Sequence, residues 1–533
     1  MSSTFMGLNT AYSGLTVAQI RMNIASNNVA NADTEGYTRQ RVEVSQSTAI
    51  QVSSNGYIGT GVEVETISQM RDEFLDSKYR DENATFGEWD AINSVLSQIE
   101  EIYNEPSDSG IIAAVDEYYN ALQELSINPD DTTARSTVRE NAIILTQVIN
   151  QVADNLTELQ ENIDYEIEVY CTDVNFMANQ IATINSQIYA AELGGDTAND
   201  LRDQRNLLLD ELSELVPIEY YEDSNGRFNV MVDGIDLVKH DSVNELVLTE
   251  RDTLLNDVDA EGLHSIAWSG GQSFDPSSGK IKGLLDMRDN MSGDTKGIPY
   301  YMDTLNEFAD TIASSINDIH KEGYDLDEGT GTYFFTVNGM SSEEYEDYLF
   351  DNKIADVTSK IVDDGDTIEE VLASDPSYEG KTIKQLNDGT YLVVDYIDAS
   401  ELTISSDIDN DLNCIAASTS ITELPGNGDN ALAMADTRND SDMFSWGSPE
   451  DYITSVVSNL GVEKSGAQTM VDNSEVIMKS IDYNRQSVSS VSLDEEMANI
   501  VQYQNTYNAN ARLLTTFDEM LDILINSTGR VGI

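Results

Sequence analysis

The chain has 533 residues, enough for about three to four ordinary domains, and 40% of them are hydrophobic, so it can form buried cores. Its 28 basic and 97 acidic residues give a formal net charge of -69. A surface this acidic repels phosphate backbones and anionic lipid, which argues against nucleic-acid and membrane partners.

The N-terminal segment predicts a helix that needs a partner. Its small or apolar residues follow a heptad pattern: Leu8, Ala11, Leu15, Ala18, Met22, Ala25 and Val29. Six residues lower its helix propensity: Gly7, Asn9, Gly14, Asn23, Asn27 and Asn28. No basic residue precedes Arg21 and no continuous apolar stretch occurs, so this is not a secretory signal peptide. A polar joint follows the helix, SNNVANADTEGYTRQRVEV from Ser26 to Val44.

Further helices are predicted in the next 170 residues. Residues 86–103 and 111–125 are predicted to form helices, separated by Pro106. A longer seam comprises Val138, Ala142, Leu145, Ile149, Val152, Leu156, Leu159, Ile163, Ile167, Tyr170, Val174, Met177, Ile181, Ile184 and Ile188. Two four-residue steps meet at Ile163, which marks one stutter in the repeat. Gly194-Gly195-Asp196 ends this helix, and residues 201–215 return as another.

After Pro217 the pattern changes to that of β-strands. Asn225-Gly226 and Asp233-Gly234 are typical hairpin turns, and strand-like pieces continue to about Gly283. A short helical seam follows from Met302 to Ile319. The segment from Ser341 to Asn413 is mixed and acidic, with Gly389–Ile397 as its clearest strand, and residues 431–436 predict a short helix.

The C-terminal segment offers the partner for the first helix. Between Val491 and Asn526, Leu493, Ile500, Tyr507, Leu514 and Leu521 repeat every seven residues, with Met497, Ala511 and Ile525 between them. Ser492 and Glu495 form a capping-box arrangement at its start. The two ends of the chain are therefore expected to meet, and no stretch is apolar enough to span a bilayer.

Residues that could carry chemistry are scattered. His240, His264 and His320 lack ligand spacing, and the glycine-rich loops that bind nucleotides are absent from the sequence. Asp407, Asp409 and Asp411 imitate a calcium loop, but Leu412 and Ser418 occupy positions that require Gly and Glu. Cys171 and Cys414 are too few for a disulfide framework and are expected as free thiols. We expect no cofactor, no metal and no enzyme activity.

Both ends of the chain resemble a known family. GLNTAYSGLTVAQIRMNIASNNVANADTEGYTRQ and LDEEMANIVQYQNTYNANARLLTTFDEMLDILIN resemble the terminal signatures of bacterial flagellar rod, hook and hook-associated proteins. Gly36-Tyr37-Thr38-Arg39-Gln40 and the helix NDLRDQRNLLLDEL (residues 199–212) favour the hook-associated branch. Glu35 stands where these proteins often carry Pro, and Ser490 where Gly is common.

The expected fold is α+β and multidomain, with the N- and C-terminal helices paired as a coiled coil, a helical-bundle second domain and β-rich inserted outer domains. The expected domains are residues 1–42 with 491–533, residues 43–216 with 286–335 and 430–490, residues 217–285, and an acidic insertion at 336–429. The resemblance implies that the paired ends line the channel of an axial structure. The expected assembly residues are Leu8, Leu15, Met22, Asn27, Asn28, Asn31, Gly36, Tyr37, Leu493, Met497, Ile500, Tyr507, Ala511, Leu514 and Leu521.

The resemblance also implies a function. A structural protein would form a ring between hook and filament, contacting its own copies, the hook protein, a second junction protein and an export chaperone at the C-terminal helix. It would be extracellular and exported without a cleaved signal. Two alternatives remain at this stage: another axial position in hook or rod, and a secreted adhesin or hydrolase whose activity lies in residues 341–413.

Overall fold

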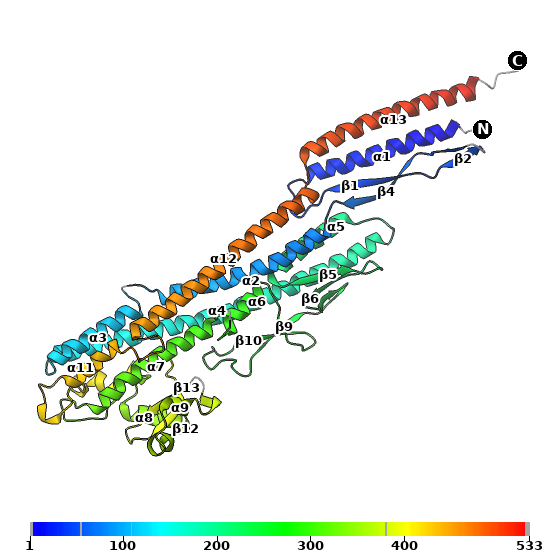
Figure 1. Ribbon diagram of the computed structural model, residues 1–533. Helices are drawn as coiled ribbons and strands as arrows, with labels where there is room; N and C mark the ends of the chain where they lie inside the picture. Colours follow the sequence, from blue (N-terminus) through cyan, green and yellow to red (C-terminus); the bar gives the residue numbers. More distant parts are fainter. Residues whose placement is uncertain (1–3, 54–55, 108, 294, 379–380, 528–533) are drawn as a thin grey trace.

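The computed structural model describes residues 4–53, 56–107, 109–293, 295–378 and 381–527. The molecule is elongated, and the first and last helices lie side by side at one end (Figure 1). Among the described residues, no helix is both long and apolar enough to cross a membrane. The α+β multidomain expectation, with long terminal helices and several small sheets, is confirmed.

The terminal layer consists of two helices and a β-ribbon. Its elements are α1 (Thr4–Ala30), α13 (Leu493–Ser527), β1 (Gln40–Gln46) and β4 (Val62–Gln69), with the small hairpin of β2 (Ile50–Ser53) and β3 (Gly56–Ile58). Strands β1 and β4 pair antiparallel and run along α1, where the Val62 N–H donates to Ser13 Oγ at 3.3 Å (Figure 1). The domain boundary expected at residue 42 falls inside β1. The ribbon therefore belongs with the terminal helices, because the partner strand that completes it begins 20 residues further on.

A bundle of long helices forms the body of the molecule. They are α2 (Glu73–Tyr103), α3 (Ile111–Ile127), α4 (Thr132–Glu192), α5 (Asn199–Leu215), α6 (Lys280–Asp289), α7 (Ile298–Glu322), α11 (Asp429–Asp436) and α12 (Pro449–Ser489). The boundary expected at residue 286 falls inside α6, which packs on α2 so closely that a side chain at Gly283 would meet the Glu88 carbonyl oxygen at 2.4 Å. Helix α2 begins 13 residues before the expected position, because Asp72 accepts hydrogen bonds from the Phe74 and Leu75 N–H groups and caps it.

Helix α4 is the spine of this body. Its 61 residues extend for about 90 Å at 1.5 Å per residue, and it contacts most of the other body helices. The predicted seam is confirmed, since its residues from Val138 to Ile188 are buried except for the half-buried Tyr170 and Ile184. The sequence pattern predicts Tyr170 as a seam residue, but the buried position is one residue later. A third four-residue step brings Cys171 onto the buried face instead, fully covered.

Both cysteines are free thiols, as expected. Cys171 packs in the main core, and burial raises the pKa of its thiol to about 12, so it carries no nucleophilic thiolate near neutral pH. Cys414 is half-buried, and burial together with nearby Asp411 raises its pKa to about 11. Both therefore serve packing.

The β-rich domain is an antiparallel meander followed by a hairpin. Its four-stranded sheet contains β5 (Ile218–Glu222), β6 (Phe228–Val232), β7 (Ile235–Lys239) and β8 (Ser242–Val243), and β9 (Leu246–Glu250) pairs with β10 (His264–Trp268). Asp233 and Gly234 have φ angles of 48° and 80°, the left-handed conformation that a tight hairpin turn requires. The predicted turns at residues 225–226 and 233–234 are confirmed.

The acidic insertion has a small core of its own. Its elements are β11 (Phe335–Val337), α8 (Ser342–Asp351), β12 (Lys353–Asp356), a π-helical turn (Ser359–Asp363), α9 (Ile368–Leu372), β13 (Lys381–Gln385), β14 (Tyr391–Asp395), β15 (Leu402–Ile404) and α10 (Ser406–Asn410). Val357, Val371, Tyr378 and Val393 form that core. The predicted strand at residues 389–397 is β14. A buried ion pair between Lys384 and Asp310 ties β13 to α7.

We predict that Ile149→Asp destabilises the helical body by about 3–5 kcal/mol, because Ile149 is 0% exposed and the charge would have no partner there. Ile144→Asp is the matched control on the same helix, since Ile144 is 50% exposed. Urea unfolding of the three chains measures the difference. Equal stability of the Ile149 and Ile144 variants would show that the seam is not the buried face of α4.

Candidate assembly site

The terminal helices α1 and α13 pack antiparallel with a contact every seven residues. A side chain at Gly7 would lie 2.4 Å from Phe517 Cζ, and one at Gly14 would lie 2.9 Å from the Asn510 side chain. One heptad further, the Arg21 guanidinium covers the Tyr503 ring at 5.7 Å from its centroid. The two glycines that weaken α1 as an isolated helix therefore make room for side chains of α13.

Most expected seam residues lie at this contact. Leu8, Leu15 and Met22 on α1, and Ile500, Tyr507, Ala511, Leu514 and Leu521 on α13, are all half-buried. Ala11, Ala18 and Ala25 are each 3% exposed and allow close approach.

At the first turns of α13 two of the expected assembly residues are exposed in the single chain, Leu493 by 52% and Met497 by 56%, and their part in assembly stays a prediction. Gly7, Gly14 and Arg21 lie opposite Phe517, Asn510 and Tyr503, so the position opposite Leu493 comes after the end of α1 at Ala30. Glu496 takes the inward position instead and is 3% exposed.

The polar joint is ordered by buried asparagine side chains. Asn28 is 1% exposed; its Oδ1 accepts from the Gln40 N–H at 3.0 Å and its Nδ2 donates to the Gln40 carbonyl at 2.9 Å. The Tyr37 hydroxyl donates to the same Oδ1 at 2.8 Å. Asn31 donates to the Asn27 carbonyl at 3.0 Å, one turn below. Asn28 thus binds the strand β1 to the end of α1.

Gly36 is required by the turn itself. Its φ of 73° lies in the left-handed region, and a side chain there would meet Leu207 of α5 at 3.3 Å. Tyr37 follows it into a half-buried position. Burial, followed by the charges of Asp200 and Asp203, raises the pKa of Tyr37 to about 12, so its hydroxyl stays protonated as a donor.

Helix α5 holds the joint through carboxylates. Asp203 accepts from the Thr38 N–H at 3.1 Å and from the Gln69 side chain at 2.7 Å, while Asp200 accepts from the Gln40 side chain at 3.0 Å. Burial raises the pKa of Asp203 to about 6, against the opposing effect of the Thr38 hydrogen bonds and of Arg71. These residues belong to NDLRDQRNLLLDEL (residues 199–212), the stretch that resembles the hook-associated branch. The sequence alone did not indicate that this stretch contacts the joint.

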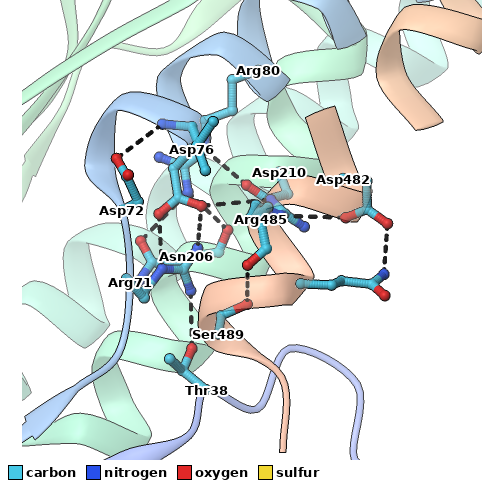
Figure 2. Close-up of polar contacts among 12 residues, drawn as sticks. Thr38, Arg71, Asp72, Asp76, Arg80, Asn206, Asp210, Asp482, Arg485 and Ser489 are labelled. Carbon is cyan, nitrogen blue, oxygen red and sulfur yellow. Dashed lines mark hydrogen bonds and ion pairs between the residues drawn. The ribbon is translucent and has the colours of Figure 1, made fainter. Parts of the chain in front are cut away.

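A second cluster of charges lies beside the joint, where α2, α5 and α12 meet (Figure 2). Arg71 donates two hydrogen bonds to Asp76, at 2.8 and 3.0 Å. Asp210 accepts from Arg80 at 2.7 Å and from Arg485 at 2.6 Å. The Arg80 side chain is 1% exposed. Sequence reasoning missed this cluster, because helical Arg and Asp residues carry no signal that distinguishes buried partners from solvated ones.

Arg39 connects the joint to the C-terminal helix. Its N–H donates to the Ser489 carbonyl at 2.9 Å, and its guanidinium pairs with Glu495 at 3.0 Å and Glu496 at 2.8 Å. Ser490 has φ −75° and ψ 154°, an ordinary extended conformation, so this site does not require the glycine that is common in the family.

Known proteins match this chain over its whole length. Family models described as "Flagella basal body rod protein" and "Flagellar basal body rod FlgEFG protein C-terminal" match residues 8–38 and 484–527. The model "Flagellar hook-associated protein FlgK helical domain" matches residues 96–335. Flagellar hook-associated protein 1 of Bacillus subtilis is 32% identical over 100% of both chains, and that of Salmonella typhimurium is 26% identical over 97% of this chain and 99% of its own.

A solved structure shares the fold. The flagellar hook junction protein FlgK from Burkholderia pseudomallei superimposes with a TM-score of 0.59 at 15% identity, covering 78% of this chain and 100% of that one. The paired ends, the joint and the matches at both termini define a structural protein of the bacterial flagellar axis. Within that class, the chain belongs to the flagellar hook-associated protein 1 family.

Carboxylates in two acidic turns, one of them the calcium-loop imitation at Asp407, bind backbone N–H groups. Asp325 accepts from the Asp327 and Gly329 N–H groups at 2.8 and 2.7 Å, and Asp407 accepts from the Ser342 N–H at 2.8 Å. Across the part of the chain that the structure describes, no group of three or more His, Cys, Asp or Glu residues is placed to hold a metal ion.

We predict that Asn28→Ala loosens the joint by about 2–4 kcal/mol, since it leaves the Gln40 N–H and carbonyl without their partner in a buried site. Hydrogen exchange of residues 37–42 in the purified chain measures this opening. Asn23→Ala, on the exposed side of the same helix, is the control and should leave exchange unchanged. Equal protection in both variants would contradict the structural role of Asn28.

The joint should also weaken as pH rises. The folded-state pKa of Asp203, about 6, lies above the usual aspartate value, so the folded chain binds this proton more tightly than the unfolded chain. The stability that this proton contributes is complete below about pH 4 and is lost as pH rises through about 6. Asp203→Asn should flatten the pH dependence of the protection factors at residues 36–41. Exposed Glu219→Gln is the control, and an unchanged profile in Asp203→Asn would refute the assignment.

Proposed function

We propose that the chain fulfils its family's structural role by forming a ring between hook and filament, with the α1–α13 pair as its polymerising layer. The observation that supports this is the apolar surface left on the far side of α13. Val501, Leu513, Met520 and Ile523 are 55%, 50%, 50% and 60% exposed, although α1 covers the opposite side of the helix. A helix that is apolar on more than one face requires more than one neighbour.

The distribution of charge supports the same role. The first 46 residues contain three arginines and three acidic residues, and residues 491–533 contain six acidic residues and two arginines. These two segments together carry -4 of the net charge of -69, so almost all of the negative charge belongs to the rest of the chain. Copies can pack side by side at their terminal helices, while the acidic parts repel one another and remain outside.

The proposed partners follow from this arrangement. They are further copies of the chain, the hook protein, a second junction protein and an export chaperone that binds the C-terminal helix before assembly. The chain acts outside the cell after export without a cleaved signal, and it catalyses no reaction. Copy number separates this role from that of a hook or rod subunit, because a junction needs few copies.

The test is deletion of the gene. Cells that lack the chain should keep their hooks, fail to swim and release unpolymerised flagellin into the medium, and the intact gene should restore filaments. Normal filaments in the deletion strain would refute the proposal.

We predict that Leu513→Asp prevents filament formation without lowering the melting temperature of the purified chain. Leu513 is 50% exposed, so the charge costs little in the monomer but would be buried between copies. Val247→Asp is the matched control, because Val247 is 42% exposed on β9, far from the terminal layer (Figure 1). Swimming by the Leu513 variant at the level of the Val247 variant would exclude this face from the assembly contact.

A further inference from the structure

A basic groove lies where α1, β1 and the start of α13 meet. It encloses about 120 Å³ and is lined by Arg21 and Ala25 of α1, Arg39 just before β1, Arg41 on β1, and Glu496 and Tyr503 of α13. Three of the 28 basic residues of the chain therefore gather at one small site. The volume admits a carboxylate side chain.

Two of these arginines lack an acidic partner. Arg39 is paired with Glu495 and Glu496, whereas no carboxylate in the described part of the chain lies within ion-pair distance of Arg21 or Arg41. Arg21 rests on the Tyr503 ring, and Arg41 is exposed on β1. In the body, by contrast, most arginines bind carboxylates of the chain itself, among them Arg71, Arg80, Arg202, Arg288 and Arg485, while Arg135 donates to backbone carbonyls.

This contrast points to a carboxylate from outside. Guanidinium groups stay charged at all physiological pH values and bind carboxylates through paired hydrogen bonds. A chain with 97 acidic residues would easily satisfy these arginines within itself if they were structural. Because Tyr503 and Arg39 already hold the walls of the groove in place, the site is formed before a ligand arrives.

Exposed carboxylates lie in the joint that links α1 to β1. Asp33 and Glu35 stand on the turn after α1, both are exposed, and neither forms an ion pair within the described residues. Asp494 is also exposed nearby, but it lies in the first turn of α13, where the helix dipole already stabilises its charge. In the proposed ring, neighbouring copies meet along the terminal layer, which carries both the groove and the joint.

We propose that the groove formed by Arg21, Arg39 and Arg41 binds the joint carboxylates Asp33 and Glu35 of a neighbouring copy. This inference rests on the proposed ring and names the contact between its subunits. The contact sets the spacing of copies through charge, whereas the apolar face of α13 supplies burial. Because the groove is only partly covered, the attraction should weaken as salt increases.

The first experiment reverses the charge of the groove. Arg41→Glu should abolish filament formation, and adding Glu35→Arg in the same chain should restore it at least in part, since the ion pair is re-formed in the opposite sense. Arg227→Glu, an exposed arginine in the β-rich domain, is the charge-matched control and should swim normally. Normal swimming by Arg41→Glu, or no rescue by the double variant, would overturn the proposal. Thermal melting of each purified variant verifies that it folds.

The second experiment identifies the neighbour directly. A photo-crosslinking amino acid at position 41, activated in isolated flagella, should give a product of two copies of this chain joined through residues near 33–35. A product that contains a different axial protein would overturn the copy-to-copy contact while leaving the junction role intact. Absence of the chain from the isolated flagella would refute the proposed function itself.

Discussion

The connection between the terminal helix pair and the rest of the molecule depends on one arginine at the joint. Arg39 donates its N–H to the end of α12 at Ser489, accepts from the Met70 N–H at the end of β4 at 2.8 Å, and pairs through its guanidinium with α13. The chain passes between the terminal layer and the body after β4 and again after α12, and Arg39 connects these two crossings. Asn28 and Asp203 fix the remaining side of the joint through buried hydrogen bonds, which help to hold the direction of the helix pair.

The positions of the arginines explain how a very acidic chain stabilises its buried carboxylates with few basic residues. Asp76 and Asp210 are largely buried between α2, α5 and α12, and each would be costly without a guanidinium beside it. Arg80 and Arg485 also stack on Tyr220 and Tyr79, at 4.5 and 4.1 Å from the ring centroids, which orients them without further charges. Buried ion pairs of this kind favour one packing over others, because any shift of a helix leaves a charge unpaired.

Sequence patterns predicted the parts of the fold that repeat. The α4 seam and the hairpin at Asp233-Gly234 follow from local periodicity and turn chemistry, and both appear as expected. Patterns did not indicate that β1 pairs with β4 along α1, or that Asp203 of α5 closes the joint, since those contacts join distant segments through polar groups. Leu493 shows a different limit: its heptad position fits the pattern, but α1 ends at Ala30, before the position that would cover it.

The glycines of α1 link these local features to assembly. Glycine lowers the helix propensity of an isolated segment, yet Gly7 and Gly14 are where Phe517 and Asn510 enter the contact. The helix thus gains close packing with α13 at the expense of its own stability. Since α13 leaves much apolar surface uncovered in the single chain, the neighbours in the proposed ring would supply the burial that the pair lacks. The apolar surface of the terminal layer would be better buried in the ring than in the single chain. This difference would favour assembly at the growing structure over a closed monomer.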